Sequence, residues 1–133
     1  MSHADLIGIP FVFGGRTLAG LDCWGLCLEF YRQRGIELVD PLEEYHDIFA
    51  TPESNVFEKY RTTDWVLVSD PSDGDLVCMA YNNAGVATHC GIYLHGGRLL
   101  HTLDKIGVVI SSYAKYQKFV TAIYRHKGVP CQN

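Results

Sequence analysis

The spacing of apolar positions predicts a helix near the start of the chain. Between residues 20 and 31, apolar side chains and cysteines recur at the spacing of one helical face, at 23, 26, 27, 30 and 31. Asp22 suits the N-cap of this helix, because its carboxylate can accept hydrogen bonds from the free amides of the first turn. Gly35 suits the helix end, where a left-handed backbone is common. The pattern therefore predicts that Cys23 opens the helix on its buried side.

The second half of the chain is predicted to form strands. Short apolar runs alternate with clusters of Gly, Pro, Asn, Asp and Ser, which is typical of antiparallel hairpins. The runs are 65–68, 76–81, 86–94, 98–103, 107–111 and 120–126. A helix over 51–61 and a helical turn near 112–117 are also expected, whereas 16–21 is predicted to be a loop. Residues 36–39 fit either a short strand or an extended connection.

Helices followed by several antiparallel strands indicate an α+β fold with a meandering sheet. No repeat or linker interrupts the pattern, so residues 1–133 are predicted to form a single domain.

Composition and charge narrow the classes of function. The net charge is −4 and the basic residues form no cluster, which argues against nucleic acid as a partner. No apolar run is long enough to cross a bilayer. The N-terminus lacks the basic and apolar regions of a signal peptide, so we expect the protein to be made in the cytoplasm.

The cysteines point to a reactive thiol. Their number is five, an odd count with irregular spacing, which does not suggest a disulfide framework. A thiol at a helix N-terminus has a lowered pKa and can serve as a nucleophile, although a small buried residue opening a helix is an equal alternative for Cys23. Cys27 and Cys78 fit buried thiols. A zinc site is conceivable, but the spacing fits no common zinc module; its candidate ligands are Cys23, Cys27, Cys78, His89 and Cys90.

Two of the six histidines, His89 and His101, differ from the others because they lie inside predicted strands of otherwise apolar residues. If the loop between these strands is 95–97, the register places His101 opposite Gly91 and makes it the diagonal neighbour of His89. A loop of even length would separate the two rings onto opposite faces. If both rings face the cysteine helix, one imidazole takes the proton of Cys23 and the other fixes its tautomer.

With these three residues in place, the chain resembles the NlpC-type cell-wall cysteine peptidases, a branch of the papain-like fold. The similar segments follow the family's order along most of the chain: 9–15, 22–26, 73–77, 89–94, 99–101, 107–109 and Arg125. The resemblance implies an N-terminal cysteine helix packed on an antiparallel β-sheet.

The resemblance also implies a catalytic triad. Cys23 is the expected nucleophile, His89 the general base and His101 the orienting residue, and the backbone amide of Cys23 is expected to contribute to the oxyanion hole. The implied reaction is hydrolysis of an amide in the peptide stem of peptidoglycan, commonly the bond from D-glutamate to a diamino acid. It requires no metal or cofactor.

Two residues depart from the family pattern. Phe11 stands where the family usually has tyrosine, and Trp24 where it usually has serine. Together with Asp22, these residues are expected to bind substrate, although Trp24 fits a core anchor beneath the helix equally well. Trp24 also makes the chain similar to peptidases of phage tail tips, which implies a place in a virion tail and other tail proteins as partners.

Two further functions are compatible with the same residues. The chain can be a structural tail module that keeps the fold without hydrolysis, as the departures at Phe11 and Trp24 suggest. It can also be an acyltransferase or esterase that forms the same acyl-thioester and passes it to an acceptor other than water.

Overall fold

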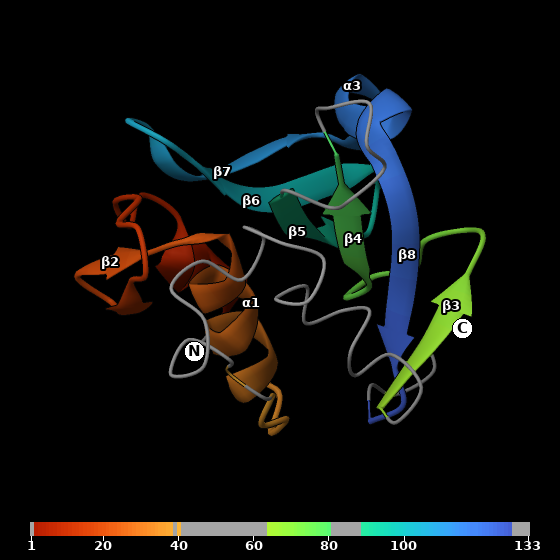
Figure 1. The fold of residues 1–133 in the computed structure, drawn as a ribbon, viewed down its shortest axis with the longest axis horizontal. Helices are drawn as coiled ribbons and strands as arrows, with labels where there is room; N and C mark the ends of the chain where they lie inside the picture. The colour runs from red at the N-terminus through yellow and green to blue at the C-terminus, as the bar shows by residue number, and fades with distance from the viewer. Residues whose placement is uncertain (1, 39, 41–63, 81–88, 129–133) are drawn as a thin grey trace.

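The computed structural model describes residues 2–38, 40, 64–80 and 89–128. These residues form a six-stranded antiparallel sheet in the order β3-β8-β4-β5-β6-β7 and a separate two-stranded hairpin (Figure 1). The elements are η1 (His3–Leu6), β1 (Arg16–Thr17), β2 (Gly20–Leu21), α1 (Cys23–Arg32), β3 (Trp65–Val68), β4 (Leu76–Met79), β5 (His89–Leu94), β6 (Arg98–Leu103), β7 (Gly107–Ser112), α3 (Tyr113–Tyr116), η4 (Gln117–Phe119) and β8 (Val120–His126). The α+β class is confirmed.

Helix α1 forms where the sequence predicts it. The Asp22 carboxylate accepts a hydrogen bond from the Gly25 amide at 2.7 Å, so it caps the helix as expected. The chain turns away after Gly35, whose φ of 78° is the left-handed conformation that glycine adopts at low cost. The predicted stripe is buried at its last four positions, 26, 27, 30 and 31.

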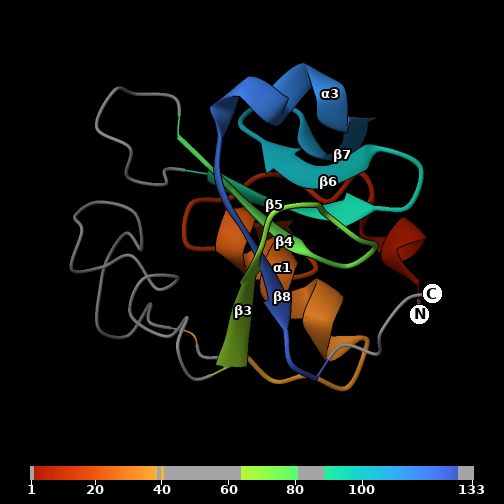
Figure 2. The same ribbon diagram turned by 90° about the vertical axis from the view of Figure 1, so that its right-hand side faces the viewer.

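The sheet separates two apolar clusters. On one face, alternate residues of β5 pack with α1; they are Cys90, Ile92 and Leu94. On the other face, Leu99 and Tyr93 pack near α3, and the rings of Tyr93 and Tyr113 meet edge to face with centroids 5.1 Å apart. Figure 2 shows α1 behind the central strands and α3 above β6 and β7. The predicted packing of the cysteine helix on the sheet is confirmed.

The central hairpin has the register expected for a three-residue loop. Leu94 of β5 pairs with Arg98 of β6, and the pairing continues to Ile92 opposite Leu100. Residues 95–97 make the turn, which needs two left-handed positions at its glycines. Strand β7 then pairs with β6 along its whole length.

Several boundaries differ from the sequence-based predictions. The expected loop 16–21 contains the hairpin β1–β2, whose strands are too short to show an alternating pattern. Residues 36–38 form no strand, and residue 39 lies outside the described residues. Strand β4 ends at Met79, beside a shift in its register with β8. The predicted helix 51–61 and the first residues of the predicted strand 86–94 lie outside the described residues.

Candidate active site

Cys23 is the first residue of α1, and its side chain is partly exposed. The loop before it is held against the helix by Asp22. One carboxylate oxygen accepts from the Gly25 amide and from Arg16 Nη1 at 2.6 Å, and the other accepts from the Gly14 amide at 3.1 Å. Because both oxygens have donors, Asp22 fixes the backbone on either side of Cys23.

Glycine at position 25 lets this loop approach the helix closely. A Cβ atom there would lie 2.2 Å from the Gly15 carbonyl oxygen, a distance that no side chain tolerates. The Arg16 guanidinium, which donates to Asp22, also donates to the Asp40 carboxylate at 2.8 Å. The loop that contains Gly14, Gly15 and Arg16 therefore holds the start of α1 in place.

The two strand histidines meet as the hairpin register predicts. His89 Nε2 and His101 Nδ1 are 3.0 Å apart. Gly91 lies between them on the same face, and a Cβ there would be 3.0 Å from the Cβ of His101. His89 is 9% exposed and His101 0%, so the pair lies almost entirely away from water.

The pair lies on the face of the sheet opposite to the one that packs against α1, so the condition that both rings face the cysteine helix is not met. Cys90 points towards α1, where its Sγ lies 3.6 Å from that of Cys27. Side chains alternate along a strand, so His89 lies on the opposite face. The ring of His101 meets that of Tyr116 of α3, with centroids 4.7 Å apart. His89 is the first residue of β5, and from the end of this strand it still interacts with Cys23.

The surroundings of Cys23 favour a thiolate. Its pKa is lowered to about 6, chiefly by the interaction with the Cys90 side chain, against the opposing effect of burial. The hydrogen bond and positive charge of His89 lower it further, while the Asp22 carboxylate opposes them. Burial, and then the charge of His89, lower the pKa of His101 to about 4, so His101 is neutral near pH 7.

A further side chain extends this arrangement. Ser111 Oγ lies 2.9 Å from His101 Nε2. His101 pairs with Val109 of β7, so Ser111 is its diagonal neighbour, as His89 is on the other side. The sequence analysis did not identify Ser111, although extending the register argument to the next hairpin finds it.

The comparison with protein families finds one match that covers most of the chain. A sequence model of the NlpC/P60 family matches residues 8–126. The chain belongs to the NlpC/P60 family. The region matched contains the described strands, α1 and the Cys23, His89 and His101 positions.

Individual NlpC/P60 relatives come from phage and from bacteria. The chain is 36% identical over 128 residues to tail tip assembly protein K of Escherichia phage N15, covering 93% of the chain and 50% of that protein. It is 31% identical over 111 residues to the murein DD-endopeptidase MepS/murein LD-carboxypeptidase of Escherichia coli K12. This match covers 83% of the chain and 50% of that protein. The chain spans about half the length, or less, of the curated relatives it matches.

A solved structure supports the NlpC/P60 fold. A protein of Staphylococcus aureus described as similar to a lipoprotein of the NLP/P60 family superposes with a TM-score of 0.61 at 28% identity. The match covers 92% of this chain and 38% of that one. The likeness to this family and to a phage tail protein agrees with the resemblance found from the motifs.

The residues expected to bind substrate have different surroundings in this NlpC/P60 protein. Trp24 is 1% exposed and belongs to the core beneath α1, as the anchor interpretation requires, so its ring does not face solvent. Phe11 is half-buried and its backbone bridges to Leu21. Substrate contact by Phe11 and Asp22 stays a prediction.

The four described cysteines are free thiols, and those at 27 and 78 are buried as predicted. No group of three or more histidine, cysteine or acidic side chains in the described ranges is arranged to hold a metal ion. None of the helices described in this NlpC/P60 protein is long and apolar enough to cross a membrane.

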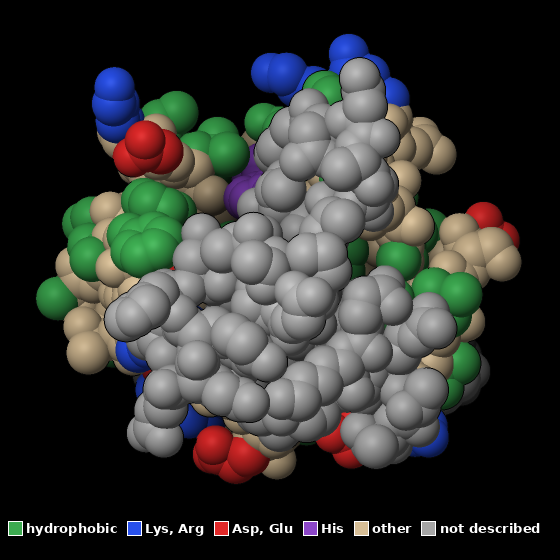
Figure 3. Space-filling view, in the orientation of Figure 1, with side chains coloured by type: hydrophobic (Ala, Val, Ile, Leu, Met, Phe, Trp, Pro, Cys, Tyr) green, Lys and Arg blue, Asp and Glu red, His purple; other side chains and the backbone are tan. Residues whose placement is uncertain are grey.

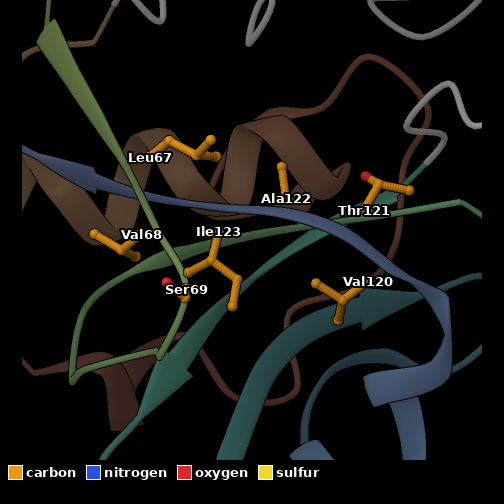
Figure 4. Close-up of a pocket in the computed structure, with 7 residues that line it drawn as sticks. All are labelled: Leu67, Val68, Ser69, Val120, Thr121, Ala122 and Ile123. Carbon is orange, nitrogen blue, oxygen red and sulfur yellow. The ribbon is translucent and has the colours of Figure 1, made fainter.

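One histidine side chain is visible on this face of the molecule, set back from the outermost side chains (Figure 3). A hollow of about 390 Å³ opens between β3 and β8 (Figure 4). Its lining carries no titratable side chain; it consists of Leu67, Val68, Ser69, Val120, Thr121, Ala122 and Ile123. This hollow therefore shares no residue with the group formed by Cys23, His89 and His101.

Proposed function

We propose that this protein is a cysteine peptidase that hydrolyses an amide bond in the peptide stem of peptidoglycan. The observation that carries the proposal is the contact of His89 Nε2 with His101 Nδ1 at 3.0 Å, with His89 also near enough to Cys23, at the start of α1, to lower the pKa of its thiol. A nucleophile, a base within hydrogen-bond reach and a group that orients the base are the parts that thiol catalysis needs.

In the first half of the proposed reaction, the Cys23 thiolate attacks the scissile carbonyl carbon. A carbon–sulfur bond forms and the carbonyl electrons move to the oxygen, which the Cys23 amide at the helix start is positioned to stabilise. The intermediate then collapses, the carbon–nitrogen bond breaks, and the leaving amine takes a proton from His89. The product of this half is an acyl-thioester on Cys23.

In the second half, His89 acts as a base. It accepts a proton from water as the water oxygen adds to the thioester carbonyl. Collapse breaks the carbon–sulfur bond and restores the thiolate beside protonated His89. Because Nε2 of His89 is engaged by His101, Nδ1 is the nitrogen that we assign to both transfers.

The relatives support the proposed substrate class and setting. A murein peptidase and a γ-D-glutamyl-L-lysine dipeptidyl-peptidase are similar to most of this chain, as their names and coverage state. The tail tip assembly protein of phage N15 is similar to 93% of it. The proposed partners are therefore the peptidoglycan stem peptide and other tail proteins, with the protein placed in a virion tail.

The proposal is tested by incubating the purified protein with defined peptidoglycan fragments and reading the products by mass spectrometry. Hydrolysis adds the elements of water across one stem amide. A transferase would instead join the acyl fragment to an added amine, and a structural tail module would leave every fragment intact. The Cys23→Ala variant is the control, because it removes the nucleophile and little packing.

A further inference from the structure

Ser111 lies at the end of a row of polar side chains that crosses three neighbouring strands. His89 is on β5, His101 on β6 and Ser111 on β7, and each is the diagonal neighbour of the next. The separations are 3.0 Å from His89 Nε2 to His101 Nδ1 and 2.9 Å from His101 Nε2 to Ser111 Oγ. The row therefore continues one residue beyond the triad.

The two ring nitrogens of His101 have different partners, so its tautomer determines what His89 can do. A neutral imidazole carries one proton. If that proton is on Nδ1, it points at His89 Nε2, and neutral His89 then holds its own proton on Nδ1, where it cannot accept one from a thiol. If the proton of His101 is on Nε2, His89 Nδ1 is free to act as a base.

When Cys23 and His89 are both charged, His101 must hold its proton on Nε2. When Cys23 is a thiolate and His89 an imidazolium, both nitrogens of His89 carry protons, so His89 Nε2 must donate to His101. His101 then presents the lone pair of Nδ1 and holds its proton on Nε2. That proton points at Ser111 Oγ, which can accept it.

Burial makes this acceptor necessary. His101 is 0% exposed, and the Tyr116 ring covers it edge-on at 4.7 Å between centroids. A buried N–H without an acceptor is costly. The low pKa of His101, about 4, agrees with a ring that stays neutral while His89 carries the charge.

We propose that Ser111 is a positioning residue that accepts the Nε2 proton of His101 and thereby holds His101 in the tautomer that lets His89 work as a base. The inference rests on the proposed roles of Cys23 and His89. It assigns Ser111 no contact with substrate; the residue acts through His101.

The first test reads the tautomer directly. Nitrogen-15 NMR of the reduced wild-type protein distinguishes an imidazole protonated at Nε2 from one protonated at Nδ1. We expect His101 to be a single Nε2-protonated species, and Ser111→Ala to give a mixture of tautomers. A wild-type His101 protonated at Nδ1 overturns the inference, and this result does not depend on the variant folding.

The second test reads the consequence at the thiol. Iodoacetamide labelling of Cys23 near pH 6 should slow by about fivefold in Ser111→Ala, the factor that corresponds to one neutral hydrogen bond. Ser111→Thr keeps the hydroxyl and should restore the rate. Ser112→Ala is the matched control, because Ser112 is the next residue of β7, is exposed, and pairs with Arg98.

The outcomes separate this inference from the proposed function. Equal labelling of wild type, Ser111→Ala and Ser112→Ala overturns the role of Ser111. If labelling and tautomer change as expected but no peptidoglycan fragment is cut, the role of Ser111 stands and the peptidase proposal fails. If fragments are cut, Ser111→Ala should lower kcat and leave KM unchanged, because Ser111 does not touch substrate.

Discussion

The side chains of Cys23 and Cys90 interact, and this interaction lowers the pKa of the Cys23 thiol. This is the largest of the interactions that lower the pKa of Cys23 to about 6. Cys90 belongs to β5 and Cys23 to α1, so the contact couples Cys23 to the sheet as well as to its own helix.

Removing the Cys90 thiol should raise the pKa of Cys23. A hydrogen bond to the thiolate favours the charged form, so in Cys90→Ala the thiol holds its proton to higher pH. We expect the midpoint of the pH–rate curve for iodoacetamide labelling of Cys23 to lie near pH 6 in the wild type and above it in the variant. Cys78→Ala removes a buried thiol from the neighbouring strand and should leave the midpoint unchanged. An unchanged midpoint in Cys90→Ala would contradict the contact.

The two histidines should not be equally important. His89→Gln leaves no proton acceptor beside Cys23 and should remove nearly all activity on peptidoglycan fragments. His101→Gln keeps a polar partner for His89 and should retain part of it. The initial rate of fragment cleavage, with each variant checked for folding by circular dichroism, measures the difference. Equal rates, or the reverse order, would show that these roles are assigned wrongly.

Trp24 should be a determinant of stability. Its side chain is almost completely buried under α1, so Trp24→Ala should lower the free energy of unfolding by about 3–5 kcal/mol. Phe13 is the matched aromatic control: it is 65% exposed, and Phe13→Ala should change the same quantity by less than about 0.5 kcal/mol. Denaturant titration compares the two. A stable Trp24→Ala protein with altered choice of substrate would instead support a pocket role.

Asp22 should contribute stability through the helix cap. Asp22→Ala removes the acceptor for the amides of Gly25 and Gly14, and should lower the free energy of unfolding by about 0.5–2 kcal/mol. Asp104, in the exposed turn between β6 and β7, caps no helix, and Asp104→Ala should cost less. If thermal unfolding shows equal losses for the two, the cap is not what holds the helix start.

The sequence predicted the features that depend on neighbouring residues. Asp22 caps α1 because N-cap chemistry is local, and the loop 95–97 fixes the register that joins His89 to His101. The face that this pair occupies was not predictable, because it depends on which side of the sheet α1 packs.

Burial and long-range contacts also could not be predicted from the sequence pattern. Trp24 lies outside the apolar stripe of α1, yet it is buried in the same core cluster as the stripe. The short hairpin β1–β2 gives too few residues for an alternating signal. The role of Ser111 depends on two successive hairpin registers, of which only the first was worked out.

The measurement that tests the central claim most directly is digestion of intact sacculi, following free amines and reducing sugar ends together. Cleavage of a stem amide exposes a new amine and breaks no glycosidic bond. We predict that the wild-type protein, folded and with Cys23 reduced, raises amines while reducing ends stay constant, and that Cys23→Ala abolishes the rise. No amine release from any type of sacculus, or equal release by Cys23→Ala, would contradict the proposal that this protein is a cysteine peptidase of the cell wall.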